Sequence, residues 1–361
     1  MPLTSKLPRV AWAAFGAVLV LTIAACGGGV RSGASSSTSH FTSTSSKLLP
    51  RPELAHVTMG VLVETGIHAA EIAIEHGLFK KYGLNATIDQ FTNQSDLDSA
   101  MLAGQIDIVL TGAANAIMAS QLTDIPTEGI FVGQTDITDN LWVSKSITKP
   151  QQLIGKAIAI SSFGSTTYGE SLITLKALGL KPSQVTITQV GDDAARQAAL
   201  FSGAVAASFN DRAEEPLMKA HGMHSLFDLA NPKHHIGLPS TMAVVTNAFA
   251  RKNPNTVLAA VAGLLEGTHL FLTKPQLAIQ AAVKFEHISY ATAKANVDYD
   301  LNGWTPDNGI APLSMWKADE VFFAKLDPSL AAVNLKKTFD AQFLTQLKSI
   351  GFDKIEKIPT S

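Results

Sequence analysis

Short apolar runs alternate with helical patterns along most of the chain. Residues 56–64 (HVTMGVLVE) are rich in Val and Leu and predict a strand. Residues 69–79 then have a helical pattern, and over residues 85–91 Ala86 and Ile88 alternate with polar side chains, which predicts a second strand. Such an alternation is typical of an α/β fold with mainly parallel sheets.

Two series of these elements follow one another. The first series continues with a helix over 95–104, where Ser95 and Asp98 have the spacing of a capping box, then a strand over 106–110 and a helix over 113–122. The second series comprises strands over 157–161, 185–190 and 205–209 and helices over 166–178 and 194–201. In both series a glycine, Gly104 or Gly203, ends a helix shortly before an apolar strand. The pattern therefore predicts two similarly built lobes.

The C-terminal part of the chain is mostly helical. Helices are predicted over 255–272, 275–285 and 341–350, with a loop rich in turn formers over 301–312. We expect these helices to pack on the first lobe.

The N-terminus has the pattern of a processing signal. Lys6 and Arg9 precede an apolar run over 10–25 that is shorter than the roughly 20 residues of a membrane span. Residues 23–26 (IAAC) resemble the bacterial lipobox, in which the cysteine is lipidated, so we expect a signal peptide over 1–25 and a lipid on Cys26. A buried core cysteine or an uncleaved anchor helix is the alternative.

The polar segment after Cys26 is expected to be a tether. Residues 27–47 are rich in Ser, Thr and Gly, and they bury too little apolar surface to offset their ordering entropy. We therefore expect a flexible tether over 26–53 and a body held outside the cytoplasmic membrane on a lipid.

Composition limits the class of protein. The 361 residues are 46 % hydrophobic and 16 % charged, which is enough for a large core and more than one compact domain normally holds. The net charge of −2 offers no basic surface for nucleic acid. A single cysteine excludes an internal disulfide framework and metal sites that need several thiolates.

The strand-to-helix junctions are the expected ligand site. In an open parallel sheet, ligands bind beyond the carboxyl ends of strands, where helix N-termini present free N–H groups. The junctions here consist mostly of Gly, Ser, Thr and Asn: residues 64–68, 92–95, 111–114, 161–167, 191–193 and 209–212. Such residues suit a small polar or anionic ligand, although each also forms turns and caps.

Charged and aromatic residues near these junctions have two interpretations each. One of Asp192 and Asp193 is expected to cap a helix, while the other is a candidate for a ligand ammonium group. Arg212 is a candidate for a carboxylate or sulfonate, or for an ordinary surface ion pair. Phe163 is a candidate wall of the pocket, and His68 begins a helix either as a ligand contact or as a cap.

The sequence offers little for catalysis. It contains no G-x-S-x-G, H-E-x-x-H or P-loop lysine motif. The histidines His221, His224, His234 and His235 are close in sequence, and the first two have the spacing of metal ligands on one helical face. Gly222 and Pro232 favour the alternative of an exposed irregular loop.

Several segments resemble a known family. The runs GLFKKYGLNATI, AGQIDIVLTG and ITKPQQLIGKAIAISSFGST, with KNPNTVLAAVAGLLEG and FDAQFLTQLKSIGF, are similar to the substrate-binding proteins of ABC importers for nitrate, sulfonate, taurine and thiamine precursors. The third run matches the family's strand, "DL-KGK-VA" turn and Gly-Ser loop through Gln152, Leu153, Gly155, Lys156, Ala157 and Ala159. The resemblance covers roughly residues 54–352.

The resemblance implies a two-lobed periplasmic-binding-protein-like fold of type II, with a ligand cleft between lobes. Lobe 1 would comprise residues 54–141 and 243–361 and lobe 2 residues 142–242, with crossings near 139–143 and 239–244. By position, the ligand contacts would be Thr65, Gly66, His68, Asn93, Gln94, Thr111, Gly112, Ser162, Ser165, Thr166 and Asn210. The chain departs from the family at Ala206, where many members have Asp, and at Asn210, where Pro usually follows the aromatic residue.

The implied function is solute capture. The chain would bind a small polar or anionic ligand by hinge closure, as a monomer without a cofactor, and deliver it to an ABC permease and ATPase complex. The same fold serves enzymes of menaquinone and pyrimidine-precursor synthesis, and an extracellular sensor is a third possibility. The single cysteine excludes the version of the pyrimidine synthase that carries a cysteine-rich iron motif.

Overall fold

The computed structural model describes residues 48–62, 68–112, 126–134, 139–163, 165–229, 231, 241–301, 309–310 and 338–356. The expected signal peptide, Cys26, most of the tether, the helix over 113–122 and most of the loop over 301–312 lie outside these residues.

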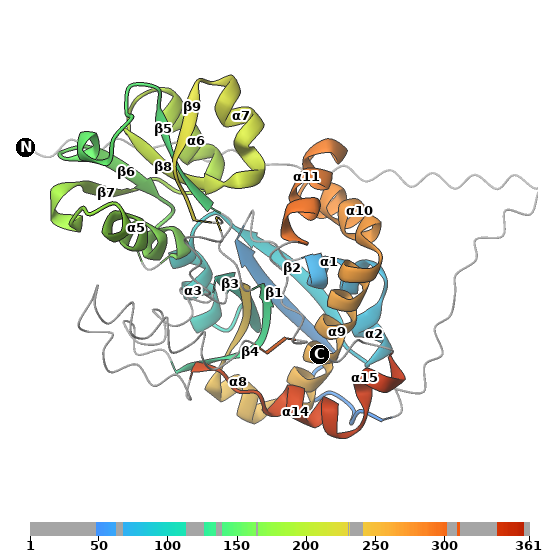
Figure 1. Ribbon diagram of the computed structural model, residues 1–361. Helices are drawn as coiled ribbons and strands as arrows, with labels where there is room; N and C mark the ends of the chain where they lie inside the picture. Colours follow the sequence, from blue (N-terminus) through green and yellow to red (C-terminus); the bar gives the residue numbers. More distant parts are fainter. Residues whose placement is uncertain are drawn as a thin grey trace, which may run out of the picture. The chain divides into compact units, whose positions relative to one another are not determined.

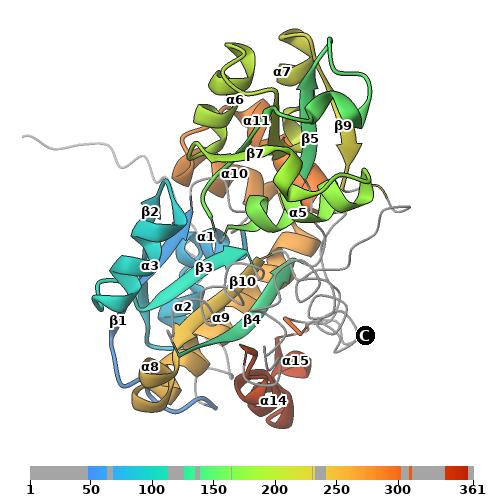
Figure 2. The ribbon, with the colours of Figure 1, turned by 90° about the vertical axis from the view of Figure 1, so that its left-hand side faces the viewer.

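In the first sheet four strands run in one direction and a fifth runs in the opposite direction between two of them (Figures 1 and 2). Its order is β2 (Asn85–Phe91), β1 (His56–Leu62), β3 (Ile108–Gly112), β10 (Thr241–Thr246) and β4 (Thr127–Gln134). Strand β1 pairs in parallel with β2 and β3, whereas β10 pairs antiparallel with β3 and β4.

The second sheet repeats this arrangement. Its order is β7 (Thr186–Gln189), β6 (Ala157–Ile160), β8 (Ala207–Asp211), β5 (Asp139–Ser144) and β9 (Met223–Asp228). Strand β6 pairs in parallel with β7 and β8, and β5 pairs antiparallel with β8 and β9. Gly104 and Gly203 have φ values of 70° and 76°, which suit glycine at the end of a helix. The predicted repeat of strand, helix and glycine is therefore confirmed.

The strands that join the two sheets differ from the expected boundaries. All of β5 pairs in the second sheet and all of β10 in the first. Residues 139–141 thus lie with the second sheet and residues 241–242 with the first, contrary to the expected lobe limits. Both segments are buried strands with partners far away in sequence, and local patterning does not identify such partners.

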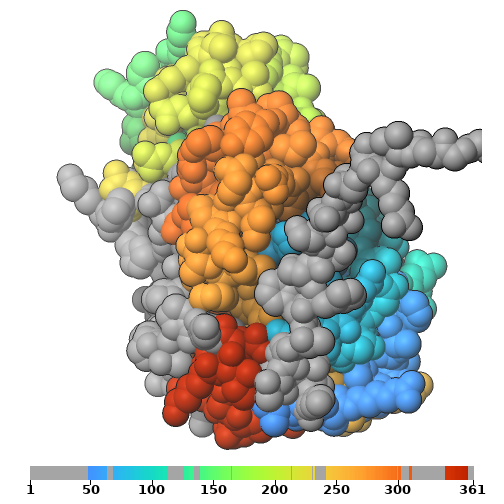
Figure 3. All heavy atoms as spheres, turned by 90° about the vertical axis from the view of Figure 1, so that its right-hand side faces the viewer, coloured from blue at the N-terminus to red at the C-terminus, as the bar shows by residue number. Residues whose placement is uncertain are grey.

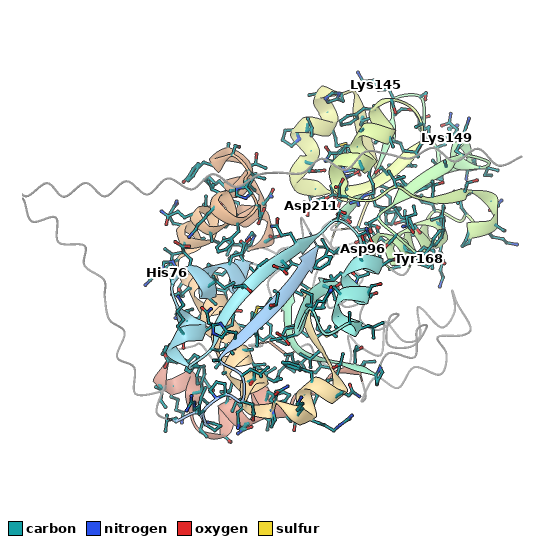
Figure 4. All side chains as sticks on the ribbon, turned by 180° about the vertical axis from the view of Figure 1, so that it is seen from behind. His76, Asp96, Lys145, Lys149, Tyr168 and Asp211 are labelled. Carbon is teal, nitrogen blue, oxygen red and sulfur yellow. The ribbon has the colours of Figure 1, made fainter. Side chains whose placement is uncertain are left out.

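A group of helices packs on the first sheet and on one another. They are α1 (His68–Glu75), α2 (Leu78–Lys81), α3 (Gln94–Leu102), α8 (Asn247–Lys252), α9 (Pro254–Thr273), α10 (Pro275–Phe285), α11 (Tyr290–Asp300), α14 (Gln342–Ser349) and α15 (Phe352–Ile355). The predicted helix over 69–79 is divided, because the chain turns at His76, labelled in Figure 4, and at Gly77, which has a φ of 68°. Helix α11 was not predicted.

The start of α3 corrects the predicted capping box. Asn93, not Ser95, is the N-cap, and its side-chain oxygen accepts a hydrogen bond of 2.9 Å from the Asp96 N–H. The helix therefore begins at Gln94, one residue earlier than expected, and Ser95 lies in its first turn.

Helix α9 is the central helix of the first core. By length and hydropathy it is long and apolar enough to cross a membrane, but 72 % of its apolar window is buried inside the protein. It packs against α1, α2, α14 and β4, which confirms that C-terminal helices pack on the first sheet. Two ion pairs of Lys81 connect α2 with α9 and with the end of α15. The Lys81 Nζ lies 2.8 Å from Glu266 and 2.7 Å from Glu356.

The remaining helices flank the second sheet. They are α5 (Thr166–Ala177), α6 (Asp193–Phe201) and α7 (Glu215–Ala220), with short 3-10 turns at η2 (Pro150–Leu153), η3 (Pro182–Gln184) and η4 (Arg212–Glu214). Ile158, Ile160, Ile173 and Phe209 are among the buried residues of this part of the core.

Candidate functional site

Polar side chains meet at the carboxyl edge of the first sheet. Thr111 lies at the end of β3 and Gln94 at the start of α3, and the Thr111 hydroxyl donates a hydrogen bond of 2.9 Å to Gln94 Oε1. The Gln94 amide in turn donates to Asp98 at 2.7 Å, while Asn93 caps the same helix. Gly112 is buried in the last position of β3. The structure thus brings together four of the predicted contacts.

A second polar group lies at the carboxyl edge of the second sheet, where α5 begins after β6. The Ser165 side chain is the N-cap and accepts a hydrogen bond from the backbone N–H of Tyr168, which Figure 4 labels in α5. The Ser165 hydroxyl also lies 2.9 Å from the Thr167 hydroxyl. Thr166 is half-buried in the first turn of the helix. The predicted contacts Ser162, Ser165 and Thr166 are therefore neighbours at one helix N-terminus.

Ser162 differs from the other residues of this group in its hydrogen bonding. It is completely buried, yet its hydroxyl has no hydrogen-bond partner among the described residues. A buried hydroxyl without a partner costs free energy unless a water or a ligand satisfies it. It is therefore an available hydrogen-bond group beside the N-terminus of α5.

Asn210, in contrast, is held entirely by its own sheet and the start of α6. Its amide nitrogen donates to the backbone and side-chain oxygens of Asp193, each at 3.3 Å, and its Oδ1 accepts from Ser208 at 2.6 Å. Asp193 also forms an ion pair with Arg196. Asp192 is the N-cap of α6, as expected for one of the two aspartates, and the other pairs within the protein.

An acidic group lies at the same edge. Burial is the main reason why the pKa of Glu170 lies well above its ordinary value. The negative charge of Asp139 and a hydrogen bond to its side chain raise this pKa further. Asp211, labelled in Figure 4 at the end of β8, acts in the same direction, while the Arg196 charge lowers the pKa of Glu170. Glu170 is therefore held in its neutral form over a wider pH range than an exposed glutamate.

His68 is a buried residue with carboxylate neighbours. It is 3 % exposed at the start of α1, its Nε2 lies 2.8 Å from Asp300 Oδ2, and its Nδ1 lies 3.7 Å from Glu71 Oε2. The ring of Phe271 stacks on it with centroids 5.3 Å apart. Sequence reasoning missed Glu71 and Asp300; the i,i+3 spacing of His68 and Glu71 was the available signal for the first.

Other candidates have separate surroundings or lie outside the described part of the chain. Arg212 lies 3.5 Å from Asp228 and is partly exposed, as an ordinary surface pair would be. His221 ends α7 and stacks on Phe201, whereas His224 lies in β9, so the two do not share a helical face as predicted. Phe163 is 57 % exposed. Thr65, Gly66, His234 and His235 lie outside the described residues.

The chemistry of the two edges is that of hydrogen bonding. Hydroxyl, amide and backbone N–H groups dominate them, and the buried imidazole of His68 contacts carboxylates and not a hydroxyl. Such groups can hold and orient a polar ligand by hydrogen bonds.

Comparison with known proteins supplies the family. The family model described as NMT1/THI5 like matches residues 65–278. The taurine-binding periplasmic protein of Escherichia coli (strain K12) is 33 % identical over 138 residues, which are 37 % of this chain and 42 % of that protein. The match thus spans less than half of the length of this curated relative.

Two solved structures share the fold. The periplasmic aliphatic sulphonate binding protein SsuA from Escherichia coli has a TM-score of 0.60 at 19 % identity, over 79 % of this chain and 91 % of that one. The periplasmic nitrate-binding protein NrtA from Synechocystis PCC 6803 has a TM-score of 0.67 at 13 % identity, over 86 % of this chain and 93 % of that one. These structures confirm the predicted two-lobed α/β fold of type II. Because the family model matches more than half of the chain, the protein belongs to the NMT1/THI5-like family.

Proposed function

We propose that the chain is the extracytoplasmic solute-binding component of an ABC importer, which captures a small polar or anionic organic ligand. Its relatives and structural neighbours are named as binding proteins for taurine, sulphonates and nitrate, which supports this class of ligand. The two polar edges would hold the ligand between the lobes, and hinge closure would present the loaded form to a permease and ATPase complex.

The unpartnered hydroxyl of Ser162 is the observation that carries this proposal. It lies fully buried beside the N-terminus of α5, whose helix dipole favours an anion. A sulfonate, nitrate or phosphate oxygen would accept the hydrogen bond that the described residues leave unmade. The proposed contact set also contains Thr65, Gly66, His68, Asn93, Gln94, Thr111, Gly112, Ser165 and Thr166. Asn210 lies at the same edge, but its side chain is hydrogen-bonded within the protein.

We also propose how the protein is held in place. Removal of residues 1–25 would leave a lipid on Cys26, and the polar tether would keep a monomeric body outside the cytoplasmic membrane. Metabolic labelling with a radioactive fatty acid tests this: label is expected in the wild type and absent from a Cys26→Ala variant.

The binding experiment uses the purified chain and isothermal titration calorimetry. Taurine, alkanesulfonates, nitrate and a pyrimidine precursor of thiamine are titrated separately, and the bound compound is recovered and identified by mass spectrometry. We expect saturable 1:1 binding to one chemical class and recovery of the compound unchanged. Conversion of the compound would favour the enzyme alternative, and absence of binding to all of these would refute the proposed ligand class.

Ser162→Ala tests the site itself. A hydrogen bond to a charged acceptor contributes about 1.5–3 kcal/mol, so the variant should bind the ligand at least about tenfold more weakly. Its melting temperature should not fall, since the hydroxyl has no partner in the protein to lose. Ser202→Ala is the matched control: this exposed serine ends α6 and donates only to the Ala199 carbonyl. Equal affinities of Ser162→Ala and the control would show that Ser162 does not contact the ligand.

A further inference from the structure

A buried histidine and acidic cluster lies among the helices of the first sheet. His68 and Glu71 come from α1, Asp300 ends α11, and Glu286 follows the end of α10. Contacts of α1 with α9 and α10, and of α10 with α11, bring these parts of the chain together. We call these four residues the His68 cluster.

Two members of the His68 cluster have buried polar atoms without a hydrogen-bond partner in the described part of the chain. Glu71 is 0 % exposed, and neither of its carboxylate oxygens has a hydrogen-bond partner among the described residues. The Nδ1 of His68 also lacks one, and it faces Glu71 Oε2 at 3.7 Å. An ionised carboxylate is costly to bury without a cation or hydrogen-bond donors, so these atoms point to a ligand of positive charge.

The other ring nitrogen of His68 is already oriented. Its Nε2 lies 2.8 Å from Asp300 Oδ2, and the ring stacks on Phe271, so the imidazole has a fixed direction. Histidines that bind metals usually donate their second N–H to a carboxylate, which fixes the tautomer and leaves the first nitrogen for the metal. Asp300 holds His68 in this arrangement, with Nδ1 directed toward Glu71.

We propose that His68 Nδ1, Glu71 and Glu286 bind a divalent transition-metal ion, with Zn²⁺ as the preferred ion and Asp300 as the positioning residue of His68. The ligand atoms of the three residues all lie within 4.8 Å of one another. An imidazole nitrogen with two carboxylate oxygens suits Zn²⁺ better than the all-oxygen cations Mg²⁺ and Ca²⁺.

The spacing requires only a small adjustment of side chains. Bonds of about 2.0 Å in a tetrahedral zinc site put ligand atoms about 3.3 Å apart. The 3.7 Å between His68 and Glu71 is already close to this value, and Glu286 is only half-buried, so its side chain has room to move. Figure 3 shows α10 and α11, in orange, at the molecular surface.

The test is titration of the chelator-treated chain with Zn²⁺, Mg²⁺ and Ca²⁺ in a calorimeter at pH 7.5. We expect saturable binding of one Zn²⁺ per chain in the micromolar range or tighter, with at least tenfold weaker binding of Mg²⁺ and Ca²⁺. Glu71→Gln should lower Zn²⁺ affinity at least tenfold. Glu75→Gln, one helical turn further along α1 and paired with Lys284 at the surface, is the matched control and should bind as the wild type does.

A second readout covers the case in which Glu71→Gln does not fold. Co²⁺ bound to the wild type should give the visible absorption of nitrogen and oxygen ligands, and Zn²⁺ should displace it. A His221→Gln/His224→Gln double variant should retain both the absorption and the Zn²⁺ affinity. The proposal is overturned if the wild type binds no Zn²⁺, if Glu71→Gln binds like the wild type, or if the double variant loses binding. The zinc titration needs no solute, so its outcome is separate from that of the solute-binding experiment, and His68 is the residue that the two proposals share.

Discussion

At Gly267, α9 lies directly against the backbone of α1. A Cβ atom added to Gly267 would lie 2.0 Å from the carbonyl oxygen of Ala69 and 2.8 Å from its carbonyl carbon. Real Cβ atoms essentially never approach another atom to under 3.0 Å, so Gly267→Ala must move the two helices apart by about 1 Å. A backbone oxygen cannot rotate away as a side chain can.

The free energy of unfolding should fall by about 2 kcal/mol. Overpacking a core typically costs about 1–3 kcal/mol, and a clash with backbone belongs at or above the upper end of this range. Alanine is more favourable than glycine in a helix by about 1 kcal/mol, and this gain offsets part of the loss. A loss of about 2 kcal/mol corresponds to a decrease of about 3 °C in melting temperature for a protein of this size, because the entropy of unfolding grows with chain length.

Urea and thermal unfolding followed by circular dichroism measure this loss. Gly263→Ala in the same helix is the matched control, since its Cβ would meet ring atoms of Phe79, at 2.3 Å and beyond, instead of backbone. The ring can shift, so this variant should lose less stability than Gly267→Ala. A Gly267→Ala variant as stable as the wild type would refute the argument that backbone contact sets the distance between α9 and α1.

Two ionisable groups give further predictions. Because burial and Asp139 raise the pKa of Glu170 in the folded state, the unfolded chain loses that proton first, and stability falls as the pH rises above about 4.5. Glu170→Gln should remove this loss, so its melting temperature should exceed that of the wild type by an amount that grows from pH 4 to pH 8; a difference independent of pH would contradict the assignment. Lys81→Met should leave Glu266 and Glu356 without the cation that both contact. Its free energy of unfolding, measured in urea at pH 8, should be about 3 kcal/mol lower than that of the wild type. Burial already raises the pKa of Glu266 to about 7, so the loss should be smaller at pH 5, where that carboxyl is protonated; an equal loss at both pH values would show that the charges are not responsible.

Local patterning predicted the parallel strands and their helices well. The strand over 85–91 and the helix over 275–285 agree with β2 and α10, and α5 and α9 agree to within a residue at each end. These elements have strong apolar periodicity or clear end signals, such as Pro275 at the first position of α10. The pattern in the residues themselves therefore determines them.

The antiparallel strands were harder to predict. β5 and β10 were interpreted as crossings between lobes, although each is the inner antiparallel strand of a sheet. Their pairing partners, β8 for β5 and β3 for β10, lie far along the chain, and no local signal identifies them. Helix α11 has almost no apolar face of its own, so it also depends on packing for its position.

The candidate site shows the same division. Thr111 and Gln94 lie at predicted strand-to-helix junctions and are among the contacts that the family resemblance implied, and the structure brings their side chains to 2.9 Å. Asn210 was predicted by the same rule, but its hydrogen bonds are all made within the second sheet and α6. Position along the chain identifies residues near an edge, whereas the direction of each side chain depends on its neighbours in space.

The sequence by itself determined the α/β class, the two repeated series and the small polar residues at the strand ends, because these follow from periodicity and residue type. Only the tertiary structure decided which of these side chains use their hydrogen-bonding groups within the protein, as Asn210 does, and which leave such a group for a ligand, as Ser162 does. It also brought Asp300 and Glu286 to His68 and Glu71 from more than 200 residues away. The physical reason is that helix packing on the first sheet places these helix ends together, and a contact across such a separation leaves no trace in the local pattern of either segment.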